Sequence, residues 1–193
     1  FFILIFSYFL GNLSASYIIG KVTANIDIRS HGSGNAGTTN VMRTLGYKAA
    51  LFTLIIDCLK GVLVVYIARR YGSENLALMA GITVVIGHNW PALLGFKGGK
   101  GIATTIGVVI SIHSTIALIC IFLVLIILFK FKYVSLAAIV GISLLPILMF
   151  SQGWNYFIFG LILCLLAIFK HKSNIQRLLH GNESKITEKI KVK

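Results

Sequence analysis

The chain has 193 residues, of which 57% are hydrophobic and 12% charged, and its mean hydropathy is +0.90. A soluble domain of this length does not need so apolar a composition, so we interpret the chain as a membrane protein. Its 18 Lys and Arg against 5 Asp and Glu give a formal charge of +13, and only the positions of these charges can decide between nucleic acid, anionic lipid and anionic substrates as partners.

Apolar runs predict the spans in chain order. The run at 101–129 would be about 43 Å long as one helix at about 1.5 Å per residue, whereas the hydrocarbon core of a bilayer is about 30 Å thick. A break at His113-Ser114 divides this run into two spans. We therefore predict an all-α integral membrane protein of one domain with about seven transmembrane helices, at about residues 2–19, 49–67, 76–86, 101–112, 115–129, 133–150 and 156–169.

Charge bias predicts the orientation of these spans. With the N-terminus outside and the C-terminus inside, every basic residue except Lys60, Arg69 and Arg70 falls on the cytoplasmic side or in the tail, as the positive-inside rule requires. The run at 76–86 is short for a crossing, so we expect the polar loop after it to dip into the bilayer. Within the second span we expect Asp57 to form a structural ion pair with Lys60, one turn away.

The first of three polar segments, residues 27–43, reads DIRSHGSGNAGTTNVMR. Its glycines allow backbone N–H groups to turn toward a common point, and its hydroxyls, amides and arginine supply further donors to a phosphate. A glycine cluster alone is more typical of an ordinary flexible loop. Because two more polar segments share the predicted cytoplasmic face, we interpret this one as part of an anion site. The candidate residues are Gly32, Ser33, Gly34, Asn35, Thr39, Asn40 and Arg43.

The second polar segment, residues 87–104, reads GHNWPALLGFKGGKGIAT. Two lysines flank a pair of glycines, and a threonine follows near the expected start of a helix, where the dipole and free N–H groups favour an anion. Two ammonium groups beside bare backbone suit a phosphate better than a metal. A lone histidine near a membrane surface is more often structural than an acid or base, so we give His88 a supporting role. The other candidates are Lys97, Gly98, Gly99, Lys100 and Thr104.

The third polar segment, residues 171–183, reads HKSNIQRLLHGNE. Ser173 or Asn174 can cap a short amphipathic helix here. A basic stretch that lies on anionic lipid headgroups is the simplest account of residues 185–193. For His171, Asn174 and Arg177 we expect a role in the site instead.

These segments resemble the three cytoplasmic motifs of the bacterial acyl-phosphate:glycerol-3-phosphate acyltransferase family, often called PlsY, in their order and at similar separations. The likeness covers nearly the whole chain. It implies transfer of a fatty acyl group from acyl phosphate to the 1-hydroxyl of sn-glycerol 3-phosphate, giving lysophosphatidic acid and phosphate, the first committed acylation of bacterial phospholipid synthesis. It also implies a protein of the bacterial plasma (inner) membrane, with a site that faces the cytoplasm and needs no metal or other cofactor. We expect a monomer.

The resemblance also assigns roles to residues. Six positions match family motif positions associated with the phosphate-bearing substrates, and all of them except Thr39 are the expected catalytic residues: Ser33, Thr39, Arg43, Lys100, His171 and Asn174. The remaining candidates are expected to bind the substrates' phosphates: Gly32, Gly34, Asn35, Thr39, Asn40, His88, Lys97, Gly98, Gly99, Thr104 and Arg177.

The sequence does not identify a general base. The His-x4-Asp motif of acyl-CoA-dependent glycerol phosphate acyltransferases is absent, and no serine or cysteine lies in a nucleophile motif. We hypothesise that the phosphate of glycerol 3-phosphate accepts the hydroxyl proton while the protein positions it.

The main alternative is a membrane transporter for phosphate or an organophosphate, because broken helices and basic loops also serve anion passage. A transport pathway needs polar residues that reach the outer face, and the predicted outer loops hold few of them. A lipid-binding scaffold would explain the basic tail but not three glycine- and amide-rich segments. Nucleic-acid binding is disfavoured because the charge follows membrane topology.

Overall fold

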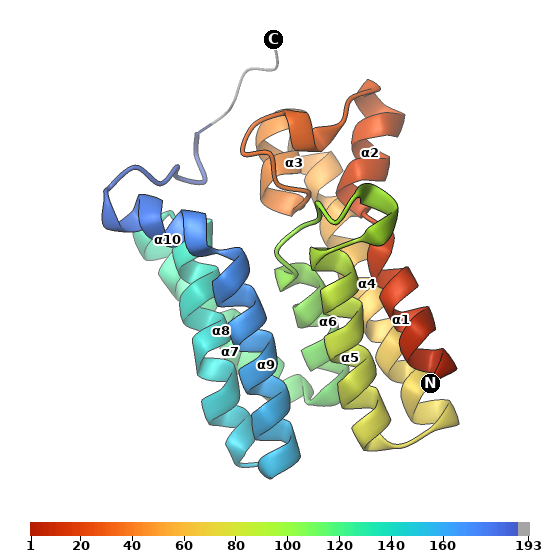
Figure 1. The fold of residues 1–193 in the computed structure, drawn as a ribbon. Helices are drawn as coiled ribbons and strands as arrows, with labels where there is room; N and C mark the ends of the chain where they lie inside the picture. The colour runs from red at the N-terminus through yellow and green to blue at the C-terminus, as the bar shows by residue number, and fades with distance from the viewer. Residues whose placement is uncertain (189–193) are drawn as a thin grey trace.

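The computed structural model describes residues 1–188, and every regular element within that range is helical. In chain order the helices are α1 (Phe2–Asn12), α2 (Ala15–Ala24), η1 (Ile28–Ser30), α3 (Thr38–Leu45), α4 (Tyr47–Tyr71), α5 (Glu74–Asn89), η2 (Ala92–Leu94), α6 (Ile102–Ile112), α7 (Ser114–Phe131), α8 (Val134–Phe150), α9 (Trp154–Lys170) and α10 (Lys172–Leu179). Figure 1 shows the long helices side by side, with the short α3 and α10 and the loops before and after η2 at one end of the bundle.

Apolar length identifies several of these helices as candidate membrane spans. Four segments are long and apolar enough to cross a bilayer, namely Phe2–Ala24, Tyr47–Tyr71, Glu74–Leu94 and Ser114–Phe131. A fifth is obtained if α9 and α10, which meet at an angle of 62°, are taken as one broken span. Helices α6 and α8 are apolar but shorter. The structure thus supports an all-helical membrane protein with four to five candidate spans by this measure.

The predicted break in the long apolar run is confirmed. Helix α6 ends at Ile112 and α7 begins at Ser114, with His113 extended between them. The His113 imidazole accepts a hydrogen bond from the backbone N–H of Ile116 at 3.4 Å and so caps α7.

Two predicted helix boundaries need correction. The first run does not end at residue 19: α1 stops at Asn12, and α2, capped by the Ser14 hydroxyl, continues to Ala24. The short run at 76–86 belongs to a longer helix, because Ser73 caps α5 before Glu74 and two buried polar residues extend it to Asn89. Burial inside the bundle, which hydropathy does not register, keeps this polar end of α5 helical.

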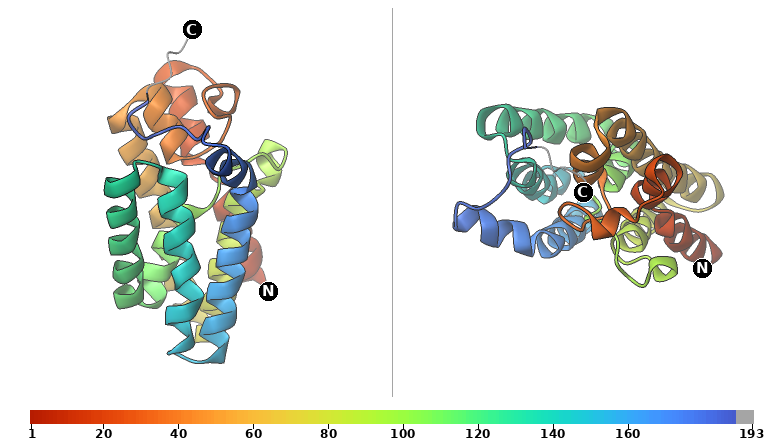
Figure 2. Two further views of the ribbon diagram at one scale, coloured as in Figure 1. Left: turned by 90° about the vertical axis from the view of Figure 1, so that its left-hand side faces the viewer. Right: turned by 90° about the horizontal axis from the view of Figure 1, so that it is seen from above.

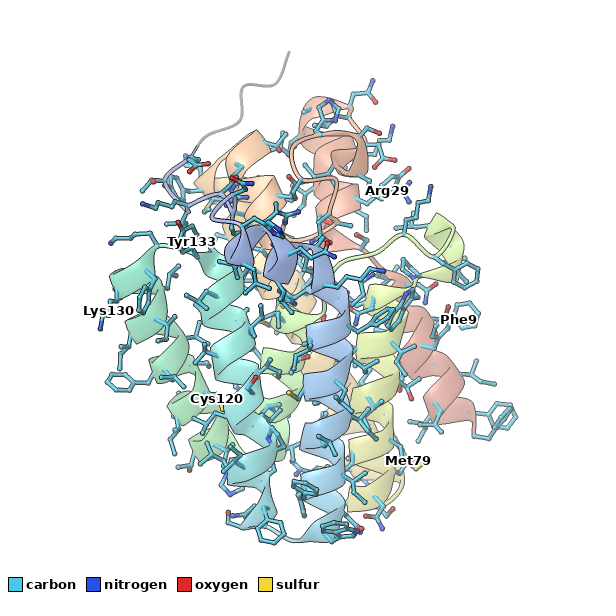
Figure 3. All side chains as sticks on the ribbon, turned by 60° about the vertical axis from the view of Figure 1, so that its left-hand side comes forward. Phe9, Arg29, Met79, Cys120, Lys130 and Tyr133 are labelled. Carbon is cyan, nitrogen blue, oxygen red and sulfur yellow. The ribbon has the colours of Figure 1, made fainter. Side chains whose placement is uncertain are left out.

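Close helix packing depends on small residues, as is common in membranes. At Gly107 of α6 an added side chain would collide with the Cys58 carbonyl of α4, and at Gly11 of α1 it would meet the backbone of α5. Large apolar side chains instead point away from the bundle: Phe9 is 48% exposed and Met79 is 52% exposed (Figure 3). This distribution is that of a surface covered by lipid.

The bundle has two sides, which Figure 2 shows from above: α7, α8 and α9 on one side, and α1, α4 and α5 on the other. Helix α6 packs on α4, and α5 contacts α9. At one end, the segment from η1 to α3 approaches α10 across the helix ends (Figure 1). The three polar segments therefore lie at the same end of the molecule.

Candidate active site

The first polar segment is a turn organised by one asparagine. The Asn40 side chain accepts a hydrogen bond from the Ser33 backbone N–H at 2.9 Å and donates to the carbonyls of Ile28 and His31, each at 3.0 Å. Gly32 and Gly34 have positive φ values of 60° and 72°, which glycine adopts without strain. Because these bonds use its amide, Asn40 shapes the segment.

The last part of this segment is not a loop. Thr38–Leu45 forms α3, so Thr39 and Arg43 are held on a helix. The Arg43 guanidinium donates to the carbonyls of Ser184 and Lys185 at 3.0 and 3.2 Å, and its Nε is buried with no partner among the described residues. Arg43 thereby joins the first segment to the tail while keeping a donor free for a ligand.

The second segment leaves α5, passes through η2 and returns into α6. Gly99 is buried, and its backbone N–H donates to the His88 carbonyl at 3.1 Å. A side chain at Gly99 would collide with the His88 imidazole and the Ala36 carbonyl. This close approach brings the first and second segments into contact. Thr104 is buried in the first turns of α6, and its hydroxyl has no partner among the described residues.

The third segment differs from the sequence prediction at its cap. Helix α10 begins at Lys172 after His171, and neither Ser173 nor Asn174 caps it. Asn174 is instead buried inside the helix, where its side-chain oxygen accepts a hydrogen bond from Lys100 Nζ. This bond joins the second segment to the third.

Glu183 completes the cluster, although no role of its own was predicted for it from the sequence. Its carboxylate accepts hydrogen bonds from the Asn174 amide at 2.7 Å, the Ser135 hydroxyl at 2.8 Å and Arg177 Nε at 2.7 Å. The feature of the sequence that could have pointed to Glu183 is its position as an acidic residue in a basic tail. Because Asn174 is fixed by Glu183, it can hold Lys100 in a defined position.

The electrostatics of the cluster depend on Lys100. Burial lowers the pKa of Lys100 to about 8. The Glu183 carboxylate raises this pKa in part. Three neighbouring cations lower it further, namely Arg177, Arg43 and Lys170. One carboxylate therefore stands against several cations, and the cluster carries an excess of positive charge. Such an excess is suited to an anion, which would offset the repulsion.

His171 is adjacent to this excess charge and is uncharged at neutral pH. Burial lowers the pKa of His171 to about 4, assisted by the positive charge of Lys100. Its Nδ1 lies 2.7 Å from the Ala167 carbonyl, so Nδ1 carries the hydrogen and Nε2 keeps its lone pair. His171 can accept a hydrogen bond at the site but is a weak base.

Not every predicted residue joins this cluster. Ser33 and Lys97 are exposed, and no hydrogen bond or ion pair of either side chain is found within residues 1–188.

Lys170 was not among the predicted residues, yet it donates to the Asn89 carbonyl at 3.0 Å. The Asn89 amide is fully buried and has no partner in the described part of the chain. Position next to His171 was the only sequence signal for Lys170.

The fold and this cluster together define a class: a helical membrane protein with a cationic, partly buried cluster, suited to an anion, at one end of its bundle. Residues 1–181 match the glycerol-3-phosphate acyltransferase family. The glycerol-3-phosphate acyltransferase of Alkaliphilus metalliredigens is 57% identical, covering 98% of this chain and 97% of the relative. That of Clostridioides difficile is 46% identical, covering 97% and 95%. The chain belongs to the glycerol-3-phosphate acyltransferase family.

Solved structures agree with this assignment. The chain is similar to crystal structures of PlsY (YgiH), an integral membrane glycerol 3-phosphate acyltransferase, with 36% identity in each case. The glycerol 3-phosphate form has a TM-score of 0.91 over 95% of this chain and 94% of that chain, and the lysophosphatidic acid form has a TM-score of 0.89 over 95% and 93%. The resemblance read from the three motifs is thus confirmed, and the transporter alternative is not favoured.

Proposed function

We propose that the acyl donor is acyl phosphate, so that the enzyme transfers a fatty acyl group to the 1-hydroxyl of glycerol 3-phosphate and releases inorganic phosphate and lysophosphatidic acid. The single observation that carries this proposal is the excess of positive charge around Lys100. One substrate phosphate on Arg43 and a second beside Lys100 would each be offset by a separate cation. Acyl phosphate is already an activated anhydride, so the protein mainly has to hold two anions together.

The chemistry of His171 supports substrate-assisted proton transfer. A histidine whose pKa is lowered to about 4 accepts a proton less readily than a phosphate group, whose second pKa is about 6. We infer that the phosphate of glycerol 3-phosphate takes the proton of the attacking hydroxyl, while His171 and Asn174 orient the substrates. The acyl carbon–oxygen bond to the donor phosphate breaks as the new ester bond forms.

The direct test of the donor is phosphate release by the purified enzyme in lipid. We expect release from acyl phosphate to depend on glycerol 3-phosphate and to match the lysophosphatidic acid formed. Acyl-CoA, the control donor, is expected to give no product. Turnover with acyl-CoA and none with acyl phosphate would overturn the proposed donor, although the enzyme would still be a glycerol-3-phosphate acyltransferase.

The proton acceptor is tested with His171→Ala. If the substrate phosphate is the base, the variant keeps a measurable part of its turnover, reduced by roughly 10- to 100-fold through lost orientation, which is less than general-base loss usually removes. Binding of glycerol 3-phosphate, measured by calorimetry, shows whether the site is intact. Complete loss of turnover with unchanged binding would make His171 the general base.

We also propose that the protein is a monomer of the bacterial inner membrane with seven spans and its site on the cytoplasmic side. The distribution of basic residues supports this orientation, and the proposed spans correspond to α1, α4, α5, α6, α7, α8 and α9, which lie side by side in Figure 1. Single cysteines placed at Lys48 and at Ser151, in a chain freed of its native cysteines, test it. We expect a membrane-impermeant thiol reagent to label only the Ser151 position in intact cells.

A further inference from the structure

A second charged cluster lies inside the bundle, next to the second polar segment. Asp57 and Lys60 of α4 are 1% and 5% exposed, and they meet His88 near the end of α5. Lys60 Nζ lies 2.8 Å from Asp57 Oδ1, as the sequence predicted, and also 2.8 Å from His88 Nδ1. It further donates to the carbonyls of Gly11 and Leu13 at 3.2 and 3.0 Å.

Lys60 is therefore surrounded by acceptors. Its ammonium group joins α4 to α5 and to the interruption between α1 and α2, where carbonyls are free because the helix stops. An ionisable residue at this depth is expensive and usually has a defined partner. The ammonium group also contacts a histidine that lines the second segment, and Nδ1 of that ring lies 3.5 Å from Asp57 Oδ1.

The contact with Lys60 fixes which nitrogen of His88 carries hydrogen. An ammonium group can only donate, so His88 Nδ1 accepts and the hydrogen of the neutral ring is on Nε2. The Nε2 side of the ring lies against Gly99, where an added side chain would collide with it. The His88 carbonyl accepts from the Gly99 N–H at 3.1 Å. Both the ring and the backbone of His88 thus set the path of the chain just before Lys100.

We propose that Lys60, held by Asp57, is a positioning residue for acyl transfer: it fixes the Nε2–H form and the ring of His88, and through His88 the Gly98-Gly99 backbone that places Lys100. Lys60 does not touch the substrates. The expected effect on turnover rests on the proposed function, in which acyl phosphate is the donor. The expected position of the hydrogen on His88 is independent of that proposal.

The variant that tests this role must remove both charges. Lys60→Met alone would leave Asp57 buried without its partner, whereas the double variant Asp57→Asn/Lys60→Met removes the pair together. The matched control is Arg69→Met/Glu74→Gln. It breaks a second ion pair between α4 and α5, of 2.7 Å, at the opposite end of the same helices.

The first readout is the 15N spectrum of histidine-labelled enzyme in lipid. A His88→Gln sample identifies the His88 signals among the five histidines. We expect wild-type His88 to carry hydrogen on Nε2 and the Asp57→Asn/Lys60→Met variant to show a mixture of both forms. Hydrogen on Nδ1 in the wild type would overturn the proposal without any variant, and the same would follow from an unchanged spectrum in the double variant.

The second readout is turnover. We expect kcat with acyl phosphate to fall on the order of 100-fold in the double variant, as a small misplacement at a distance can cause, with a much smaller change in KM for glycerol 3-phosphate because Arg43 stays in place. The Arg69→Met/Glu74→Gln control should retain its turnover. If the Asp57→Asn/Lys60→Met variant and the control lost turnover equally, Lys60 would only stabilise the fold. An inactive wild type with Nε2–H on His88 would contradict only the proposed donor.

Discussion

The two charged clusters of this enzyme differ in their charge balance. Around Lys60, one carboxylate balances a single ammonium group, which also donates to one imidazole and two carbonyls. Around Lys100, one carboxylate stands among several cations, and nearby polar atoms such as Arg43 Nε and the Thr104 hydroxyl have no partner within the described residues. The difference teaches that a charge-balanced cluster holds the fold, whereas a cluster with excess positive charge suits a ligand that brings its own negative charge.

Among the variants that test this comparison, the one without Lys100 should lose the most activity. We expect Lys100→Gln to lower kcat by about 10²- to 10³-fold, the usual effect of losing one preorganised donor. Phosphate release at saturating substrates measures it. Because the cluster is overloaded with positive charge, the variant should unfold at no lower temperature than the wild type.

The control for that variant is Lys48→Gln, which removes an exposed lysine at the same end of the molecule. It should keep wild-type turnover. If Lys100→Gln also kept it, Lys100 would not take part in the reaction, and the excess charge would need another explanation.

Exchange of Arg43 for lysine should have an intermediate effect. Arg43→Lys retains the charge but loses the planar guanidinium that can bind a phosphate with two donors. We expect KM for glycerol 3-phosphate to rise by roughly tenfold, equivalent to about 1.4 kcal/mol, with kcat less affected. Arg70→Lys in the last turn of α4 is the matched control, and unchanged affinity in Arg43→Lys would show that Arg43 does not bind the phosphate.

The pH dependence should give the smallest change in activity, but at a well-defined pH. Lys100 is charged below its pKa of about 8, so its contribution is present at neutral pH and declines as the pH rises through that value. We expect kcat/KM to fall by about half at pH 8 relative to its maximum, because half of a group is deprotonated at its pKa.

In Lys100→Arg this decline should move to much higher pH, since a guanidinium stays charged. Any remaining activity of that variant, measured between pH 6 and 10, is sufficient for the comparison. An unchanged decline near pH 8 would assign the titration to another group.

Features of the fold set by local patterns were predictable from the sequence. Hydropathy, length and the positive-inside bias of the basic residues placed the break at His113. Spacing by one helical turn was enough to pair Asp57 with Lys60. The ends of α2 and α5 were not predictable, because the stability of polar residues such as His88 and Asn89 in a helix depends on burial against other helices.

The candidate site was predictable in its residue types and less so in its contacts. Glycines, lysines and amides identified the three segments, but the bond from Lys100 to Asn174 joins residues 74 positions apart, which no local pattern reveals. Glu183 likewise has its importance from three partners, Ser135 on α8 and Asn174 and Arg177 on α10. Asn40 was predicted to bind phosphate, and the sequence did not reveal that its amide also shapes the turn.

The place of Glu183 has a consequence for how the enzyme is made. Ribosomes synthesise the chain from α1 onward, so α4 to α9 can enter the bilayer before the carboxylate that fixes Asn174 and Arg177 has been translated. Until then Lys100 and its neighbouring cations repel one another without an internal counter-charge. Nascent chains and early-terminated products should therefore insert as membrane proteins but remain unable to acylate, and the active site is completed only near the end of translation.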